Sequence, residues 1–204
     1  MNEEIHQKFL DIAGSISLDL QSAFRDIGPI PFPNRKERGL AFFLARAVVG
    51  QQISMGAAKS IWKRIEDEAE NNRSRIPGFF HDENRLLLQK CGVSSNKAKA
   101  LLSIRQAEVE GLLAPQTVDE MDAKAKSKHL QQIWGVGQWT ADMALIFFFQ
   151  EPDVWPEGDI SVQKIFQQFV DEGQARLDSN AAELFAPYRS YLALYMWRIV
   201  DGDV

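Results

Sequence analysis

Two short segments hold the residues whose types and spacing could do chemistry, residues 130–144 and 155–162. The first contains a glycine–valine–glycine turn at 135–137 between two stretches with the apolar spacing of helices. Glycine adopts positive φ without a Cβ penalty and lets the backbone approach a ligand, so we expect a tight hairpin there. Amides that open the second helix would lack intrahelical partners, and such amides bind anions such as phosphate. In the second segment Asp159 follows a Pro-Glu-Gly turn, and a carboxylate at a helix entrance together with a phosphate-binding hairpin predicts a catalytic pair.

The elements that must position these residues are predicted to be almost entirely helical. Apolar residues recur at spacings of three and four, and few segments alternate in the manner of strands. Ser54 and Ser94 are good N-cap residues and predict helix starts at their positions. Helices are expected over residues 3–13, 17–26, 37–50, 54–69, 82–90, 94–110, 127–134, 138–149, 160–171, 179–185 and 188–200, with a short one opened by Thr117, Asp119 and Glu120. The sequence therefore predicts an all-α fold.

Composition limits the class of protein. The chain of 204 residues suits one domain or a two-lobed one, and 45% apolar residues suffice for a sizeable core. The chain has no run of apolar residues long enough to span a membrane, and its acidic N-terminus has no signal-peptide core, so we expect a cytoplasmic protein. The single cysteine, Cys91, excludes an internal disulfide and a cysteine-held iron–sulfur cluster, and the histidines lack zinc-ligand spacing.

Four segments together resemble the helix-hairpin-helix (HhH-GPD) DNA glycosylase superfamily. Besides the hairpin segment at 130–144, residues 45–54 are similar to the family's Gly-Gln-Gln-x-Ser turn, and residues 91–99 to its Gly-x-Ser-x-x-Lys helix start. Residues 186–193 are similar to the closing helix of the alkylbase branch, the 3-methyladenine DNA glycosylase II type. The resemblance covers roughly residues 30–200, in the family's order and spacing.

The resemblance implies a single glycosylase domain of two helical lobes with the active-site cleft between them. Residues from about 55 to 155, with the hairpin at 133–139, would form a central lobe. The N-terminal and C-terminal helices would form the other lobe. In this family the hairpin grips the DNA backbone, and an aspartate after a loop rich in proline or glycine serves the chemistry.

Asp159 is the catalytic residue that the resemblance implies. Breaking an N-glycosidic bond builds positive charge on the sugar, which a fixed carboxylate stabilises while it orients or deprotonates a water. From the residues alone Asp159 could instead be only the N-cap of the next helix, and Glu157 and Asp153 are competing acids. The family pattern places the acid just before a helix with an apolar residue three positions on, and Val162 fits Asp159 to this pattern.

Trp139 distinguishes two branches of the family. In the lyase branch a lysine at this position attacks the sugar, whereas an indole cannot form a Schiff base, so the resemblance implies a monofunctional, hydrolytic enzyme. In the alkylbase branch an aromatic residue here stacks on the extruded base, and a cationic alkylated base is attracted to an aromatic face. Tyr188 and Met143 would be further pocket walls, although many branch members carry an aromatic residue instead of Met143, which leaves the base preference open. The alternative for Trp139 is a core position, and packing is the expected role of Trp134 and of the phenylalanines at 147–149.

The remaining predicted site residues would contact DNA or a cation. Gln52 is similar to the wedge side chain that fills the gap left by a flipped nucleotide, and the alternative for it is a surface glutamine. The family's hairpin also commonly holds a monovalent cation, Na⁺ or K⁺, through backbone carbonyls, which here would be those of Gln131, Ile133 and Val136. No other cofactor is implied. The predicted DNA-contacting residues are Gln51, Gln52, Ser54, Lys97, Gly135, Val136, Gly137 and Thr140.

The net charge of −5 argues against nucleic-acid binding, because DNA-binding domains usually carry a basic patch. The total does not locate the charge, however, and several lysines fall near the hairpin or the helix start at Ser94, which would allow a local basic face. These are Lys59, Lys63, Lys97, Lys99, Lys124, Lys126 and Lys128.

Together these observations predict a monomeric DNA glycosylase that flips alkylated bases out of double-stranded DNA and hydrolyses their glycosidic bonds in base excision repair. The expected substrates are purines of the 3-methyladenine type. One alternative is a helix-hairpin-helix DNA-binding module without activity, against which Asp159 counts because a pure binder needs no acid. The other is a glycosylase for oxidised or mismatched bases, against which Trp139 and the lack of cluster cysteines count.

Overall fold

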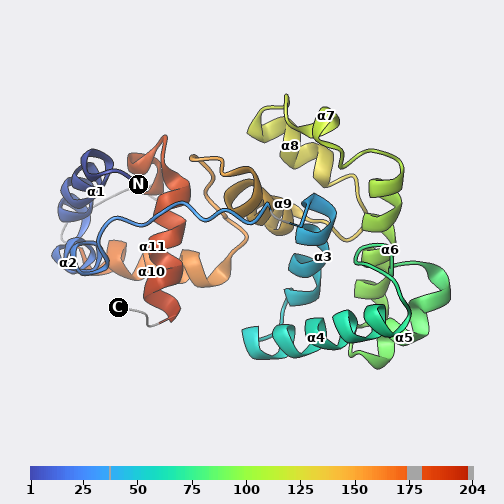
Figure 1. Ribbon diagram of the computed structural model, residues 1–204. Coiled ribbons are helices and arrows are strands. Elements are labelled where there is room, and N and C mark those ends of the chain that lie inside the picture. The colour runs from blue at the N-terminus through green and yellow to red at the C-terminus, as the bar shows by residue number, and fades with distance from the viewer. Residues whose placement is uncertain (37, 174–180, 202–204) are drawn as a thin grey trace. The chain divides into compact units, whose positions relative to one another are not determined.

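In the computed structural model, which describes residues 1–36, 38–173 and 181–201, every regular element is helical (Figure 1). No strand occurs within these ranges, so the all-α prediction is confirmed. The chain divides into two compact units, of which the middle unit is Arg35–Phe149. The terminal unit combines Met1–Asn34 with Gln150–Val204. Across the described ranges, no helix has the length and apolar character needed to cross a membrane.

The middle unit consists of short helices around one hydrophobic core. Its elements are α3 (Leu40–Gly50), α4 (Met55–Asn71), the 3₁₀ turn η1 (Asp82–Asn84), α5 (Arg85–Lys90), α6 (Ser95–Val109), α7 (Pro115–Val118), α8 (Ala123–Leu130), α9 (Gln138–Ala144) and the π-helical turn η2 (Leu145–Phe149). Trp62 of α4 packs edge-on against Phe42 of α3, with ring centroids 5.1 Å apart. Ile65, Phe79 and Leu101 are completely buried in the same core.

Helix α3 belongs to the middle unit, although the predicted lower boundary near residue 55 would place it with the N-terminal helices. It packs against α4, α6 and α9. The physical reason is its composition, because α3 is apolar almost all round and buries residues on several faces, from Leu40 to Val49. A helix of this kind must be covered on more than one side. The unit therefore begins at Arg35 and ends at Phe149.

Two predicted helix starts are confirmed by their capping hydrogen bonds. Ser54 Oγ accepts the Ala57 amide hydrogen at 3.3 Å, and Ser94 Oγ accepts that of Lys97 at 3.3 Å. Each hydroxyl satisfies one amide that has no partner within its own helix.

The segment before the hairpin differs from the prediction. The short helix α7 starts at Pro115, because proline suits the first position of a helix. It ends at Val118, whereas the predicted helix starts only at Thr117. Helix α8 starts at Ala123, capped by Asp122, whose Oδ1 accepts the Ala125 amide hydrogen at 2.7 Å. It ends at Leu130 rather than at residue 134, so the turn that follows is longer than expected.

The terminal unit has an aromatic core. Its elements are α1 (Glu3–Ile16), α2 (Leu18–Ile27), α10 (Ile160–Glu172), the 3₁₀ helix η3 (Ala181–Phe185) and α11 (Arg189–Asp201). Phe24 stacks on Tyr195 with ring centroids 4.2 Å apart, and Phe9 lies 4.9 Å from Phe185. This core ties the first two helices of the chain to the last one. Of the helix expected at 179–185, residues 179 and 180 lie outside the described residues.

Candidate functional site

The glycine–valine–glycine turn forms a hairpin between α8 and α9. The Val136 amide donates a hydrogen bond to the Ile133 carbonyl oxygen at 3.0 Å, and the Val136 side chain is buried. Gly135 has a φ of +87°, and a Cβ at this position would lie 2.3 Å from the Cβ of Ala100 on α6. Any other residue at 135 would therefore strain the turn and push it away from α6.

Gly137 serves the hairpin in a different way from the predicted one. Its φ is −90°, so the expectation of positive φ at both glycines is wrong for this residue. Gly137 is the extended N-cap residue of α9, and a Cβ built on it would meet no atom within 4 Å. No side chain accepts a hydrogen bond from the first amides of α9. The glycine matters here because it leaves space in front of these amides.

Three residues predicted to contact DNA form hydrogen bonds within the middle unit, at the end of α3. Gln51 Nε2 donates to Thr140 Oγ1 at 2.8 Å, and Thr140 is buried. The Lys97 ammonium donates to the carbonyl oxygens of Val49, at 2.8 Å, and of Gln51, at 2.7 Å, and burial lowers the pKa of Lys97. Carbonyls at a helix end lack intrahelical partners and carry partial negative charge, which holds the lysine there. Gln51 and Thr140 thus link the hairpin helix α9 to the end of α3, and Lys97 links α6 to the same end.

The loop between α3 and α4 carries the predicted wedge. Gln52 is exposed and has a φ of +55°, a conformation that residues other than glycine rarely adopt. Backbone strain of this kind is found at functional sites. Beside it Ile53 and Met55 are 38% and 67% exposed, although both are apolar. Sequence reasoning missed these two residues, whose signal is an apolar side chain on either side of the Ser54 cap.

Trp139 and Met143 lie one helical turn apart on α9. Met143 is buried, whereas Trp139 is half-buried, so part of the indole is accessible from outside the middle unit. A completely enclosed core position for Trp139 is therefore wrong.

Trp134 departs from its predicted packing role, whereas the phenylalanines at 147–149 do pack. The Phe148 ring lies 6.0 Å from that of Phe43 and 5.1 Å from that of Phe149. Trp134 is 44% exposed, because it stands in the turn after α8 has ended and not on the buried face of a helix. The Lys99 ammonium lies 4.2 Å from the centroid of its ring. The phenylalanines at 147–149 are half-buried in the π-helical turn rather than fully enclosed in the core.

Asp159 is the N-cap residue of α10 in the terminal unit. Its Oδ1 accepts the amide hydrogens of Ser161 and Val162, both at 3.1 Å. The indole N–H of Trp197, on α11, donates to Oδ2 at 3.3 Å. The N-cap interpretation is thus confirmed, and it is compatible with a catalytic role, because donors on both oxygens fix a carboxylate that remains partly exposed.

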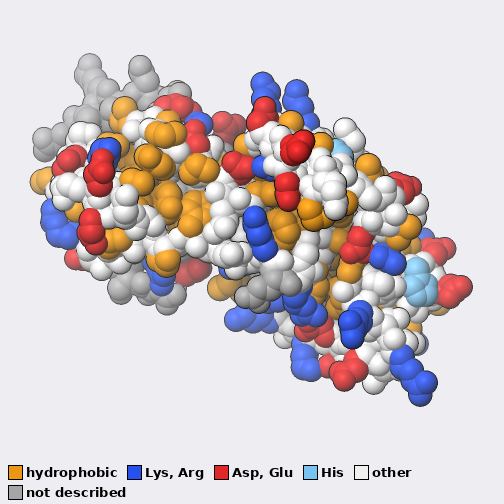
Figure 2. Space-filling view, turned by 45° about the horizontal axis from the view of Figure 1, so that its top comes forward, with side chains coloured by type: hydrophobic (Ala, Val, Ile, Leu, Met, Phe, Trp, Pro, Cys, Tyr) orange, Lys and Arg blue, Asp and Glu red, His pale blue; other side chains and the backbone are white. Residues whose placement is uncertain are grey.

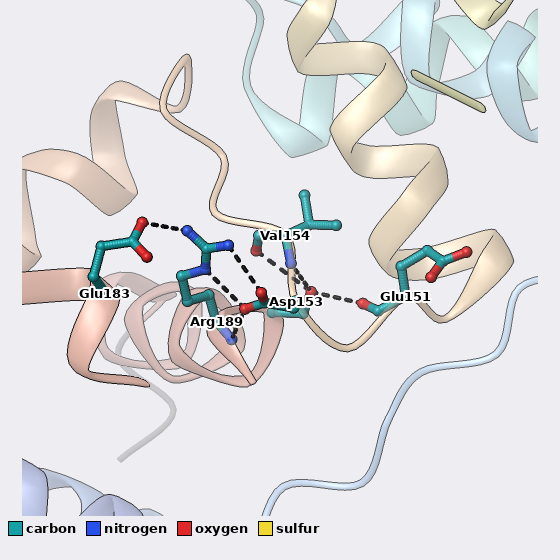
Figure 3. A network of polar contacts seen from close by, with 6 residues as sticks. Glu151, Asp153, Val154, Glu183 and Arg189 are labelled. Carbon is teal, nitrogen blue, oxygen red and sulfur yellow. Dashed lines mark hydrogen bonds and ion pairs between the residues drawn. The ribbon is translucent and has the colours of Figure 1, made fainter. Parts of the chain in front are cut away.

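Asp153, a competing acid, is occupied by an ion pair (Figure 3). Arg189 Nε and Nη2 donate to its two carboxylate oxygens at 2.7 and 2.8 Å, and the Arg189 amide donates at 3.2 Å. Hydrogen bonds from the guanidinium hold the pKa of Asp153 below its usual range. Arg189 also pairs with Glu183. Asp153 therefore has a structural role, while the other competitor, Glu157, is exposed.

The first turn of α11 secures the loop that leads to Asp159. Ser190 Oγ accepts the Val154 amide hydrogen at 2.9 Å and donates to the Glu151 carbonyl oxygen at 2.7 Å (Figure 3). At the other end of the loop, the Asp159 amide donates to the Pro156 carbonyl oxygen at 2.9 Å. The Arg-Ser pair of the segment at 186–193 thus holds the loop in place, a role that sequence reasoning did not assign.

Tyr188, the predicted second pocket wall, is half-buried directly before α11. Its ring is tilted against that of Tyr191, with centroids 6.4 Å apart, and Phe32 packs edge-on against Tyr191 at 4.8 Å. The structure thus places Tyr188 at the end of an aromatic row within the terminal unit.

The basic residues do not all contribute to a surface charge. On the face that Figure 2 shows, Lys and Arg side chains are interspersed with Asp and Glu side chains. Lys63 pairs with Asp67, Lys97 binds carbonyl oxygens, and Lys126 is buried. Lys63 is exposed but paired, and the exposed lysines near the hairpin or on α4 without an acid partner among the described residues are Lys59, Lys99, Lys124 and Lys128.

Comparison with known proteins gives the family. No protein-family model matches the chain. The chain is 29% identical to DNA-3-methyladenine glycosylase 1 of Schizosaccharomyces pombe over 159 residues, which cover 76% of this chain and 70% of that protein. It is 29% identical to DNA-3-methyladenine glycosylase 2 of Escherichia coli over 160 residues, which cover 74% of this chain and 55% of that longer protein. A solved structure of 3-methyladenine DNA glycosylase from Schizosaccharomyces pombe, in complex with abasic DNA, matches with a TM-score of 0.78 and 25% identity over 95% of this chain and 97% of that one.

These similarities extend over most of the chain. They also agree with the all-helical architecture. The similarity in sequence and in fold supports the HhH-GPD DNA glycosylase superfamily, in its alkylbase branch, as the family of this chain.

Proposed function

We propose that the protein is a monofunctional DNA glycosylase that removes alkylated bases of the 3-methyladenine type from double-stranded DNA. The two relatives compared above are DNA-3-methyladenine glycosylases by name, and the similar solved structure holds abasic DNA. The observation that carries the proposal is the carboxylate of Asp159, held by hydrogen bonds to both oxygens at the entrance of α10.

Asp159 would act on the sugar of the flipped nucleotide. As the glycosidic bond lengthens, positive charge develops on the deoxyribose, and a carboxylate fixed beforehand stabilises it without reorganising. The same carboxylate would accept a proton from the attacking water, so that the products are a free base and an abasic strand. The loop contacts of Ser190 and Arg189 support this role, because they hold the chain that ends at Asp159.

Trp139 would bind the base. An indole lacks the amine needed for a Schiff base, which supports hydrolysis without strand cleavage. Alkylation at a ring nitrogen makes a purine cationic, and an aromatic face attracts a cation. The half-buried indole of Trp139 on α9 supports this assignment, and Met143, one turn further along, is a non-aromatic neighbour.

The hairpin and the loop after α3 would hold the duplex. Space in front of Gly137 leaves room for a phosphate at the hairpin. Gln52, with its strained backbone and exposed side chain, would fill the gap left by the flipped nucleotide. Both contacts are independent of base sequence, so binding should fall as salt rises.

We also propose a monovalent cation at the hairpin, bound by the carbonyl oxygens of Gln131, Ile133 and Val136. Hard cations prefer oxygen donors, and the Ile133 carbonyl keeps a lone pair besides the one that accepts the Val136 amide. Among the described residues no cluster of His, Cys, Asp or Glu side chains could hold a metal ion. The bound cation would attract a phosphate oxygen. Duplex affinity should then be higher in Na⁺ or K⁺ than in a bulky tetraalkylammonium salt at equal ionic strength.

An excision assay tests the proposed function. The purified protein is incubated with DNA methylated by dimethyl sulfate, and released bases are separated by chromatography. We expect release of methylated purines, including 3-methyladenine, and none from duplexes with a single oxidised base or mismatch. Binding to DNA without release of any base would indicate a binding module instead. Release from the oxidised or mismatched duplexes alone would assign the enzyme to another substrate class.

A further inference from the structure

An exposed tryptophan and an exposed lysine form one surface feature of the middle unit beside the hairpin. Trp134 is 44% exposed and directly precedes Gly135. The Lys99 side chain reaches it from α6, and its ammonium lies 4.2 Å from the ring centroid, at cation–π distance. The two residues therefore present an apolar ring and a positive charge together.

The scaffold holds this pair firmly. Gly135 lies so close to α6 that a Cβ on it would meet the Cβ of Ala100 at 2.3 Å, and Lys99 is the neighbour of Ala100 on that helix. The Gln51 side chain links the hairpin helix to the end of α3 through Thr140. The indole and the ammonium are thus presented by two elements in direct contact, which makes them preorganised for a ligand.

The charge of Lys99 has no carboxylate partner within the described residues, whereas Lys8 and Lys63 each pair with an acid on their own helix. An exposed tryptophan beside a charged side chain is typical of contact surfaces. Burial of a large aromatic ring under a partner removes much apolar area from water and so favours binding. A partner for this pair needs a negative group and a flat apolar group a few ångströms apart. A nucleotide backbone supplies both, as phosphate and deoxyribose.

We propose that Trp134 and Lys99 form a contact surface for the DNA backbone, where the indole packs on a deoxyribose and the ammonium binds a neighbouring phosphate. This inference rests on the proposed DNA glycosylase function. DNA is favoured as the occupant because the surface is continuous with the hairpin and its charge is complementary to phosphate. The contact would add sequence-independent affinity outside the base pocket.

The test measures duplex binding of Trp134→Ala, Trp134→Phe and Lys99→Ala by fluorescence anisotropy over a series of salt concentrations. Trp134→Ala should weaken binding to damaged and undamaged duplexes alike, by about three- to tenfold, and Trp134→Phe should restore much of it. Lys99→Ala should make the slope of log affinity against log salt less negative by about one. Thermal melting should be nearly unchanged, because both side chains are exposed.

Matched controls come from α5, where Leu86 is 71% exposed and Lys90 is exposed. Leu86→Ala and Lys90→Ala should bind as the parent does. If Trp134→Ala and Lys99→Ala also bind as the parent does, the inference is overturned while the proposed function stands. Loss of self-association in sedimentation, with DNA affinity unchanged, would assign the surface to a second copy of the chain and overturn it too. A parent protein that binds no DNA would overturn the proposed function itself.

Discussion

Replacing Asp159 by asparagine separates the structural role of this side chain from its proposed chemical role. Asn ranks with Asp as an N-cap residue, and its carbonyl oxygen can accept the same two amide hydrogens, so α10 should keep its start. The hydrogen bond from Trp197 to Oδ2 should be lost if the amide nitrogen takes that place. One partly exposed hydrogen bond contributes about 1 kcal/mol, which corresponds to a melting temperature about 2–4 °C lower for a chain of this size.

The effect on the chemistry should be far larger. Removing a fixed charge aimed at a developing cation costs about 10²–10³ in rate, so the single-turnover excision rate of Asp159→Asn should fall by that factor. Affinity for lesion-containing duplex should stay near that of the parent, because Asp159 is not among the proposed phosphate contacts. A rate within a few-fold of the parent in a folded Asp159→Asn protein would refute the assignment and make Glu157 the next acid to test. Glu157→Gln is the matched control, since it removes the charge of an exposed acid two positions away and should leave the excision rate near that of the parent.

Three further outcomes are expected. Gly137→Asp should weaken binding to damaged and undamaged duplexes in filter binding while the protein melts no lower than the parent, because the new carboxylate would cap α9 and repel phosphate; unchanged binding would remove the hairpin from the DNA interface. Borohydride added during turnover should trap no covalent DNA adduct, because Trp139 stands where the lyase branch has an amine, and a trapped adduct on a denaturing gel would reveal another amine. Burial lowers the pKa of His6 from its ordinary 6.5, so the unfolded chain binds protons more readily and the free energy of unfolding should fall as the pH drops below about 6.5. Denaturant melts should reveal this slope in the parent, and a His6→Gln protein with the same slope would contradict it.

Local features of the fold could be predicted from the sequence because they depend on neighbouring residues. The hydroxyls of Ser54 and Ser94 accept amide hydrogens three positions on, so the residue type and the apolar pattern that follows suffice. Pro115 is an equally local signal, which the prediction did not use when it placed the start of this helix at Thr117. The membership of α3 could not be predicted in this way, because two of the helices that cover it, α6 and α9, lie far along the chain.

The same distinction applies to the candidate site. The position of Asp159 at a helix entrance follows from its own segment, and its N-cap role is confirmed, while the catalytic role that the family pattern implies stays a prediction. The pairing of Asp153 with Arg189 joins residues 36 positions apart, and that of Lys97 with the Gln51 carbonyl joins residues 46 apart. The apolar periodicity of a sequence does not indicate which charged side chains will bind a group that lies far away along the chain. The bonds of Lys97 to the end of α3 therefore could not be predicted from the sequence.

The residue at the N-cap of a helix determines whether the first amides of that helix bind a side chain of the same chain, as comparison of α10 and α9 illustrates. At α10 the chain supplies its own anion, because Asp159 accepts the amides of Ser161 and Val162, and the helix thereby fixes the direction of the carboxylate. At α9 the N-cap is Gly137, and no side chain fills that place, so an external anion can occupy it. The first arrangement orients a negative charge, and the second leaves room to receive one. A glycosylase needs both, since it must stabilise a cationic sugar while it holds an anionic backbone, and one residue type at each N-cap is enough to distinguish the two tasks.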